Sequence, residues 1–291
     1  MKASESLFYD VRGLRYHVRH WPGDPKRRMV LLHGWMDVSA SFQFLVDALQ
    51  ADWDVFAPDW RGYGLTDWGR SDCYWFPDYV ADLDSLLERL QPEGPVDLVG
   101  HSLGGNVACL YAGVRPARVR RLVNLEGFGM AATGPQQAPA RYARWLDELR
   151  QRNSGFRPYA GFAALAERLQ NNNPRLPRPR AEFLARHWGR ETQDGRVVLR
   201  GDPAHKIVYP VLYRYEETRA CWEQVAAPVL WVDAARSDTL KRIGLSEAQH
   251  AERRAAFRNL RYATVMDAGH MLHHDQPEQV ARLIEAFLEA E

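Results

Sequence analysis

The chain has 291 residues, of which 46% are hydrophobic and 26% charged, and its 38 basic and 37 acidic residues leave a formal charge of +1. This composition is typical of a soluble globular protein of one large domain or two small ones, and it excludes fibrous, disordered and membrane-embedded classes. A chain so nearly neutral has no overall field to attract nucleic acid or anionic lipid, so we expect neither as a partner.

The three cysteines are far apart in the sequence and show no metal-binding spacing: Cys73, Cys109 and Cys221. We expect reduced thiols and neither a metal nor a cofactor. The first residues lack the apolar core of a signal peptide, and no apolar run approaches the roughly 18 residues that span a bilayer. These features favour a cytoplasmic protein without a membrane span, and we expect it to be a monomer or a homodimer.

The first part of the chain predicts alternating strands and helices. Residues 7–21 alternate between apolar and polar and predict an antiparallel hairpin. Strands are predicted at 29–32, 53–57, 95–99 and 119–125, and helices at 39–50, 76–90 and 106–113. Fully apolar strands separated by amphipathic helices favour a mostly parallel sheet with helices on both faces.

The pattern changes between residues 131 and 225, which are rich in arginine, proline and aromatic side chains. We interpret this range as a helical cap inserted into a core domain formed by residues 1–130 and 226–291. Within it, helices are predicted at 138–152, 161–170 and 180–188, and an extended piece at 195–200. The core alternation then resumes with strands at 228–232 and 260–265 and helices at 246–257 and 277–288.

The pentapeptide Gly100-His101-Ser102-Leu103-Gly104 lies between a predicted strand and a predicted helix. A Gly-x-Ser-x-Gly sequence in that context is typical of a sharp, strained turn that exposes a nucleophilic serine, because only glycine avoids collisions on either side. The sequence therefore predicts that Ser102 is a nucleophile.

A serine hydroxyl needs a general base, and imidazole suits that role at neutral pH. His270 is the best candidate because it follows the last predicted strand, while His273 and His274 are expected to line the site. A carboxylate should orient the imidazole. Asp238 is preferred for this role, and Glu126 is the main alternative.

Asp233 is a further candidate for the acid, although it is close to the end of its strand. The amides of Trp35 and Leu103 are expected to form the oxyanion hole, since each follows the end of a buried strand. His33 is expected to be a buried hydrogen-bonding residue rather than a catalyst.

Four motifs occur in an order that resembles the α/β-hydrolase fold superfamily: 33–35 (His-Gly-Trp), 59–64 (Asp-Trp-Arg-Gly-Tyr-Gly), 100–105 (Gly-His-Ser-Leu-Gly-Gly) and 269–270 (Gly-His). Residues 124–129 and 210–217 are similar to those of serine hydrolase-like proteins. The resemblance implies an eight-stranded sheet, a nucleophile elbow at Ser102 and a helical cap. Asp59 and Arg61 are expected to brace the sheet edge rather than react.

These features favour a serine hydrolase that works through an acyl-enzyme, as a carboxylesterase or thioesterase on a small to medium apolar ester. Serine at the elbow argues against the epoxide and haloalkane hydrolases of the superfamily, which resemble one another in using a carboxylate there. A carbon–carbon hydrolase of a diketone, a perhydrolase and a non-catalytic binding protein remain as alternatives.

The expected substrate pocket is apolar because aromatic residues gather in two regions of the sequence. In the core they are Trp60, Trp68, Tyr74, Trp75 and Phe76, and in the cap they are Phe156, Tyr159, Phe162, Trp188, Tyr209, Tyr213, Tyr215 and Trp222. The arginines of the cap could bind a carboxylate or phosphate, but a solvated helix face is the favoured interpretation.

Overall fold

The computed structural model describes residues 1–69, 71–151 and 155–290. Its main sheet has eight strands in the order β1-β2-β4-β3-β5-β6-β9-β10. The strands are β1 (Glu5–Val11), β2 (Leu14–Trp21), β3 (Asp24–Leu32), β4 (Trp53–Pro58), β5 (Val96–His101), β6 (Val119–Leu125), β9 (Val229–Ala234) and β10 (Leu260–Val265). β1 and β2 pair antiparallel, as do β2 and β4, and the remaining pairs are parallel.

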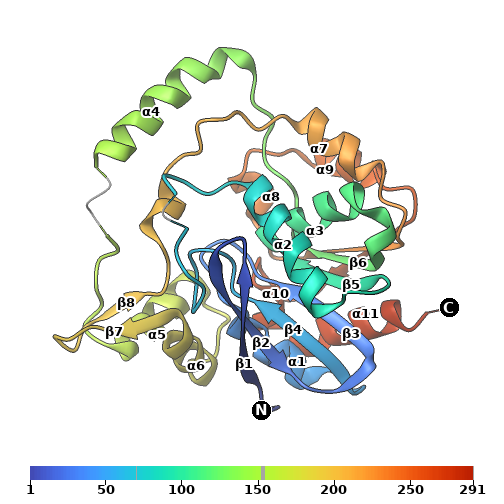
Figure 1. Cartoon of the computed structure of the whole chain (residues 1–291), viewed down its shortest axis with the longest axis horizontal. Coiled ribbons are helices and arrows are strands. Elements are labelled where there is room, and N and C mark those ends of the chain that lie inside the picture. The colour runs from blue at the N-terminus through green and yellow to red at the C-terminus, as the bar shows by residue number, and fades with distance from the viewer. Residues whose placement is uncertain (70, 152–154, 291) are drawn as a thin grey trace.

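Helices pack on both faces of this sheet, which confirms the predicted fold class (Figure 1). They are α1 (Gln43–Ala48), α2 (Phe76–Leu90), α3 (Leu103–Val114), α4 (Ala138–Arg150), α5 (Phe162–Asn172), α6 (Arg178–Trp188), α7 (Tyr215–Trp222), α8 (Thr239–Arg242), α9 (Glu247–Ala255), α10 (Leu272–Asp275) and α11 (Pro277–Leu288). A short hairpin of β7 (Gly189–Glu191) and β8 (Val197–Leu199) lies apart from the main sheet.

The side-chain alternation of the central strands divides the interior into two apolar cores. On β3, Val30 and Leu32 join the core beneath α2 and α3, whereas Met29 and Leu31 join the core beneath α1 and α11. A strand that is buried on both faces must be apolar at every position, and this explains the uninterrupted run at 29–32.

The segment between β6 and β9 contains most of the predicted cap. α5, α6 and β8 enclose a third apolar cluster, and Phe44 of α1 is the core residue that joins it. α7 packs on α3, and its Trp222 lies in the same core as Trp231. We therefore propose that the cap ends before α7 rather than at residue 225.

Most predicted elements are present with small shifts of their ends. The helix predicted at 39–50 begins as a 3₁₀ turn over Ser39–Phe42. The last residue of the helix predicted at 138–152 lies outside the described residues. The sequence did not predict β7, α7, α8 or α10. Within the described ranges, no helix combines the length and apolar character that crossing a bilayer requires.

Candidate active site

Ser102 occupies a strained turn between β5 and α3. Its backbone has φ +53° and ψ −114°, a conformation that non-glycine residues seldom adopt. A Cβ on Gly104 would lie 2.0 Å from the carbonyl oxygen of Leu32, and one on Gly100 would lie 2.4 Å from that of Gly104. The two glycines of the pentapeptide therefore let strand and helix approach closely enough to form the turn.

Three side chains from separate loops form a continuous hydrogen-bonded chain. Ser102 Oγ lies 3.0 Å from His270 Nε2, and His270 Nδ1 lies 3.1 Å from Glu126 Oε2. In the neutral tautomer that fits this arrangement, the hydroxyl donates to Nε2 and the Nδ1–H donates to the carboxylate. This is the geometry required for an imidazole to remove the serine proton.

Glu126 is held in place by the strand next to its own. It follows β6 with a backbone φ of +57°, and its side chain is fully buried. The Ala234 amide of β9 donates to Oε1 at 2.7 Å, and Ser237 Oγ donates to Oε2 at 2.5 Å. These bonds leave Oε2 directed at His270 and fix the orientation of the ring.

The structure does not bring Asp238, the acid that the sequence analysis preferred, into hydrogen-bond contact with His270. Asp238 is exposed at the start of α8, and the described carboxylate that hydrogen-bonds the imidazole is that of Glu126. Asp233 is buried, but it accepts from Trp231 Nε1 and from the Tyr262 hydroxyl instead. The positive φ at Glu126 turns its side chain into the site, whereas the chain beyond β9 carries Asp238 out toward solvent.

Burial shifts the pKa values of the base and its partner in opposite directions. Burial, with a smaller contribution from the Arg242 charge, lowers the pKa of His270 to about 4. Burial also raises the pKa of Glu126 to about 7, although the Ser237 and Ala234 hydrogen bonds oppose it. The lowered pKa of His270 keeps its imidazole neutral, and the raised pKa of Glu126 weakens the negative charge that would favour the imidazolium. The imidazole can therefore accept a proton near pH 7.

The elbow and the histidine loop are joined directly. His101, which precedes the nucleophile, donates from Nε2 to the backbone oxygen of His270 at 2.7 Å. The ring of His101 is buried, and burial lowers its pKa well below the usual value, so this imidazole stays neutral. The second residue of the Gly-His-Ser motif thus helps to hold the loop that carries His270.

The loop after β3 passes close to the nucleophile. A Cβ on Gly34 would lie 3.3 Å from the Ser102 Cβ. His33 holds this loop, because its Nε2 accepts the Trp60 amide at 2.9 Å and its Nδ1 donates to the Gly34 oxygen at 2.8 Å. His33 is therefore the buried hydrogen-bonding residue that the sequence predicted.

The two amides predicted to bind an oxyanion belong to residues on the elements next to Ser102. Leu103 is the first residue of α3, where backbone N–H groups have no acceptor within the helix. Trp35 follows Gly34 on the adjacent loop, and its side chain donates to the backbone oxygen of His205 at 3.2 Å. The joint action of these two amides as an oxyanion hole stays a prediction.

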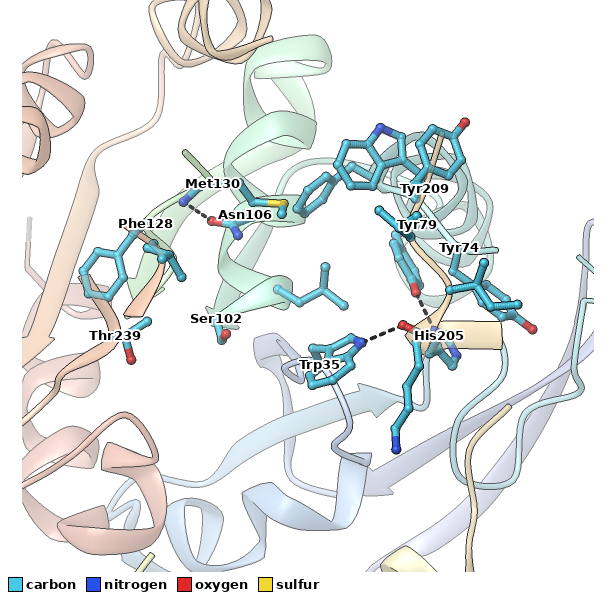
Figure 2. A pocket seen from close by; sticks show the side chains of 18 of the residues that line it. Trp35, Tyr74, Tyr79, Ser102, Asn106, Phe128, Met130, His205, Tyr209 and Thr239 are labelled. Atoms are coloured by element: carbon cyan, nitrogen blue, oxygen red, sulfur yellow. Dashed lines mark hydrogen bonds between the residues drawn. The ribbon is translucent and has the colours of Figure 1, made fainter. Parts of the chain in front are cut away.

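Two cavities meet at Ser102. The first, of about 430 Å³, is largely aromatic and includes Tyr74, Trp75, Phe76, Tyr79, Phe128 and Tyr209. Figure 2 shows Tyr74, Tyr79 and Tyr209 across this space from Ser102. The second, of about 860 Å³, contains His270 and is lined by cap residues that include Trp188. Of the predicted core aromatics, Trp60 is instead buried in the core and Trp68 is exposed.

A group of three buried polar residues lies beside the site. Asp37, His273 and His274 offer ligand atoms within 4.8 Å of one another and could hold a metal ion. Ser41 Oγ already contacts His274 Nε2 at 2.5 Å and His273 Nε2 at 3.3 Å. Asp37 Oδ2 lies 3.9 Å from His273 Nε2, beyond hydrogen-bond distance, so Ser41 is the residue that links the two histidines.

Known proteins share both this sequence pattern and this fold. A serine hydrolase-like protein from Danio rerio is 29% identical over 277 residues, which cover 92% of this chain and 83% of the relative. The thioesterase domain from the curacin biosynthetic pathway superimposes with a TM-score of 0.86 at 22% identity, over 98% of this chain and 99% of the domain.

A hypothetical protein from Pseudomonas aeruginosa has a TM-score of 0.87 at 25% identity, and the match covers 98% of this chain and all of the other. Residues 27–277 match the alpha/beta hydrolase fold family, a range that contains the elbow, the base and every carboxylate considered above. The chain therefore belongs to the alpha/beta hydrolase fold family and is a hydrolase.

Proposed function

We propose that this protein is a serine esterase or thioesterase that uses Ser102 as nucleophile, His270 as general base and Glu126 as the orienting acid. The observation that carries the proposal is the chain of hydrogen bonds at 3.0 and 3.1 Å from Ser102 through His270 to Glu126. Ser102, at one end of this chain, lies at the junction of two cavities, where a substrate can reach it. The names of the zebrafish relative and of the thioesterase domain agree with this chemistry.

In the first half of the reaction, Ser102 Oγ attacks the carbonyl carbon while its proton moves to His270 Nε2. The buried carboxylate of Glu126 stabilises the imidazolium that forms. The carbonyl oxygen becomes an oxyanion, which the amides of Trp35 and Leu103 would bind. His270 then gives its proton to the leaving oxygen or sulfur, and the acyl group stays on Ser102.

In the second half, water replaces the leaving group beside His270. The imidazole removes a proton from that water, and the resulting attack on the acyl-enzyme releases the acid and restores Ser102. The aromatic cavity is the place for the acyl group, because its walls are apolar and Leu103 and Phe128 lie in it with Ser102. A small to medium apolar acyl group fits its volume of about 430 Å³.

A fluorophosphonate probe tests the nucleophile, since it reacts with activated serines. We expect it to label the wild-type protein at Ser102, and Ser102→Ala to abolish both labelling and the hydrolysis of a p-nitrophenyl ester. Ser246→Ala is the matched control, because that serine caps α9 away from the site and its loss should leave labelling intact. Unlabelled, well-folded wild-type protein would show that the fold serves as a binding module.

The pH profile of kcat/KM should depend on the Glu126 and His270 pair. Burial raises the pKa of Glu126 to about 7, so acidification first neutralises the charge that stabilises the imidazolium, and activity should fall below about pH 7. In Glu126→Gln that carboxylate is gone, and the remaining acid limb belongs to His270. Its pKa is lowered by burial, so the limb should move to lower pH. An acid limb that stays in place or moves upward would contradict this assignment.

A further inference from the structure

The two cavities differ in their relation to the base. Both contain Ser102, but only the second contains His270. Because His270 must hand its proton to the departing oxygen or sulfur, the leaving group has to lie on the side where His270 is exposed. The second cavity is thus the side from which the alcohol or thiol part of the substrate departs.

The charged groups of the second cavity are mainly positive. Arg175, Arg236 and Arg242 line it, and Asp238 is the one carboxylate among its lining residues. Its two imidazoles, His270 and His274, are buried enough for their pKa values to be lowered, so they add no charge near pH 7.

These three guanidinium groups have few strong acceptors. Arg242 donates to Thr239 Oγ1 at 3.1 Å, and Arg236 lies 3.9 Å from the exposed carboxylate of Asp267. No salt bridge joins Arg175 to any carboxylate in the described part of the chain. Each can therefore still donate charge-assisted hydrogen bonds to a bound anion.

Neighbouring cations behave differently. Arg178, on α6 just beyond Arg175, pairs with Glu182 at 2.7 Å. Cations also line the aromatic cavity, but Arg144 pairs with Glu148 at 2.6 Å and Arg141 donates to the backbone oxygen of Tyr209. The third cation there, Lys206, lies over the ring of Phe156 at 4.5 Å. Arg141 thus also lacks a carboxylate partner among the described residues, but three arginines without a close carboxylate line the leaving-group side and only this one lines the aromatic cavity.

Arg175 is placed beside the base itself. A Cβ on Gly269, the residue before His270, would lie 3.0 Å from Arg175 Nη1. The nearby carboxylate of Asp275 is already engaged, because Oδ1 accepts from Asn173 and Oδ2 accepts from the Gly269 amide. An anion in this cavity would meet Arg175 from one side and Arg242, the last residue of α8, from another.

We propose that the second cavity is an anion-binding subsite, so that the preferred substrates carry a carboxylate or phosphate on the alcohol or thiol part, a few bonds from the scissile carbonyl. Arg175, Arg236 and Arg242 bind that group while the apolar acyl chain occupies the aromatic cavity. This inference rests on the proposed function, and it gives the exposed residues Arg175, Arg236 and Arg242 a binding role at the rim of the cavity.

Thioesters with one acyl group and different leaving groups test the subsite. The probes are hexanoyl thioesters of 3-mercaptopropionate, of its neutral amide, of 2-mercaptoethyl phosphate and of thiocholine. The released thiol is measured with a reagent that becomes coloured when it reacts with thiols. We expect kcat/KM to be highest for the anionic probes, lower for the amide and lowest for the cation. The carboxylate and phosphate probes show which anion is preferred.

Two variants separate anion binding by Arg175 from general effects on catalysis. Arg175→Ala should lower the ratio of kcat/KM for the better anionic probe to that for the amide by about tenfold or more, as expected for loss of a charge-assisted contact. Arg178→Ala, whose side chain pairs with Glu182 outside the cavity, should leave the ratio within about twofold of wild type.

The outcomes distinguish the two proposals. Equal rates for all four probes, or a preference for thiocholine, would overturn the anion subsite while leaving the esterase proposal intact. If Ser102 is labelled by fluorophosphonate but none of the probes is hydrolysed, the subsite assignment fails together with the acyl pocket. Absence of both labelling and hydrolysis would overturn the proposed function itself.

Discussion

Replacing Glu126 by glutamine is expected to lower kcat for ester hydrolysis by about 10³- to 10⁴-fold without unfolding the protein. Glutamine has nearly the same shape, but its amide can donate to Nδ1 of His270 and favour the tautomer that cannot accept the Ser102 proton. It also removes the charge that stabilises the imidazolium. The measurement is kcat and KM with a p-nitrophenyl ester, together with a thermal melt.

Asp238→Asn is the matched comparison, because both carboxylates follow neighbouring strands of the sheet. Asp238 is exposed and acts on His270 only through its charge, so its loss should change kcat by no more than about threefold. The double variant Glu126→Gln/Asp238→Asn should keep at least about a third of the kcat of the single variant Glu126→Gln. A larger loss in Asp238→Asn than in Glu126→Gln would restore Asp238 as the acid.

Asp82→Ala is expected to reduce the free energy of unfolding by about 3 to 5 kcal/mol, because it removes the close carboxylate partner of the buried Arg61 guanidinium and leaves it only the longer contact of 3.5 Å with Asp78. Arg61 donates to Asp82 through Nε at 2.5 Å and Nη2 at 2.6 Å, and the Tyr16 hydroxyl donates at 2.7 Å. The Asp82 side chain is fully buried. This network joins β2, the loop after β4 and α2, so its loss should appear as a lower urea midpoint.

Asp84→Ala provides the control on the same helix. Asp84 is partly exposed, accepts from the Tyr111 hydroxyl at 3.1 Å and makes a looser contact of 3.4 Å with Arg115, so its loss should cost only about 1 to 2 kcal/mol. Equal losses for Asp82→Ala and Asp84→Ala would show that the buried network adds nothing to stability. The sequence prediction that Arg61 braces the sheet edge agrees with the ion pair seen here.

The elements that the sequence predicted well are those with a strong apolar period. α2 and α11 carry clear apolar faces, and both begin with a proline in the first turn, where its missing N–H costs nothing. α7 was missed because it is short and is stabilised by Trp222 packing in the core beneath it rather than by its own pattern. Length and periodicity therefore explain both the successes and the omissions.

The sequence by itself determined the fold class and proposed Ser102 and His270 as nucleophile and base, because a strained turn requires particular residues around a nucleophilic serine and His270 follows the last strand. It preferred Asp238 to Glu126 as the acid, since β6 and β9 are neighbours, both end at the same sheet edge, and the pattern alone does not show which carboxylate reaches His270. Only the tertiary structure shows that Glu126 contacts His270, through the positive φ and the Ala234 hydrogen bond that direct its side chain.

Tertiary structure alone also sorted the arginines. Arg175 and Arg178 look alike in the sequence and both are exposed, yet one lines the cavity beside His270 and the other pairs with Glu182. The physical reason is that the environment of a charge depends on neighbours that are distant in the chain, whereas the period of a helix or the glycines of a turn act locally.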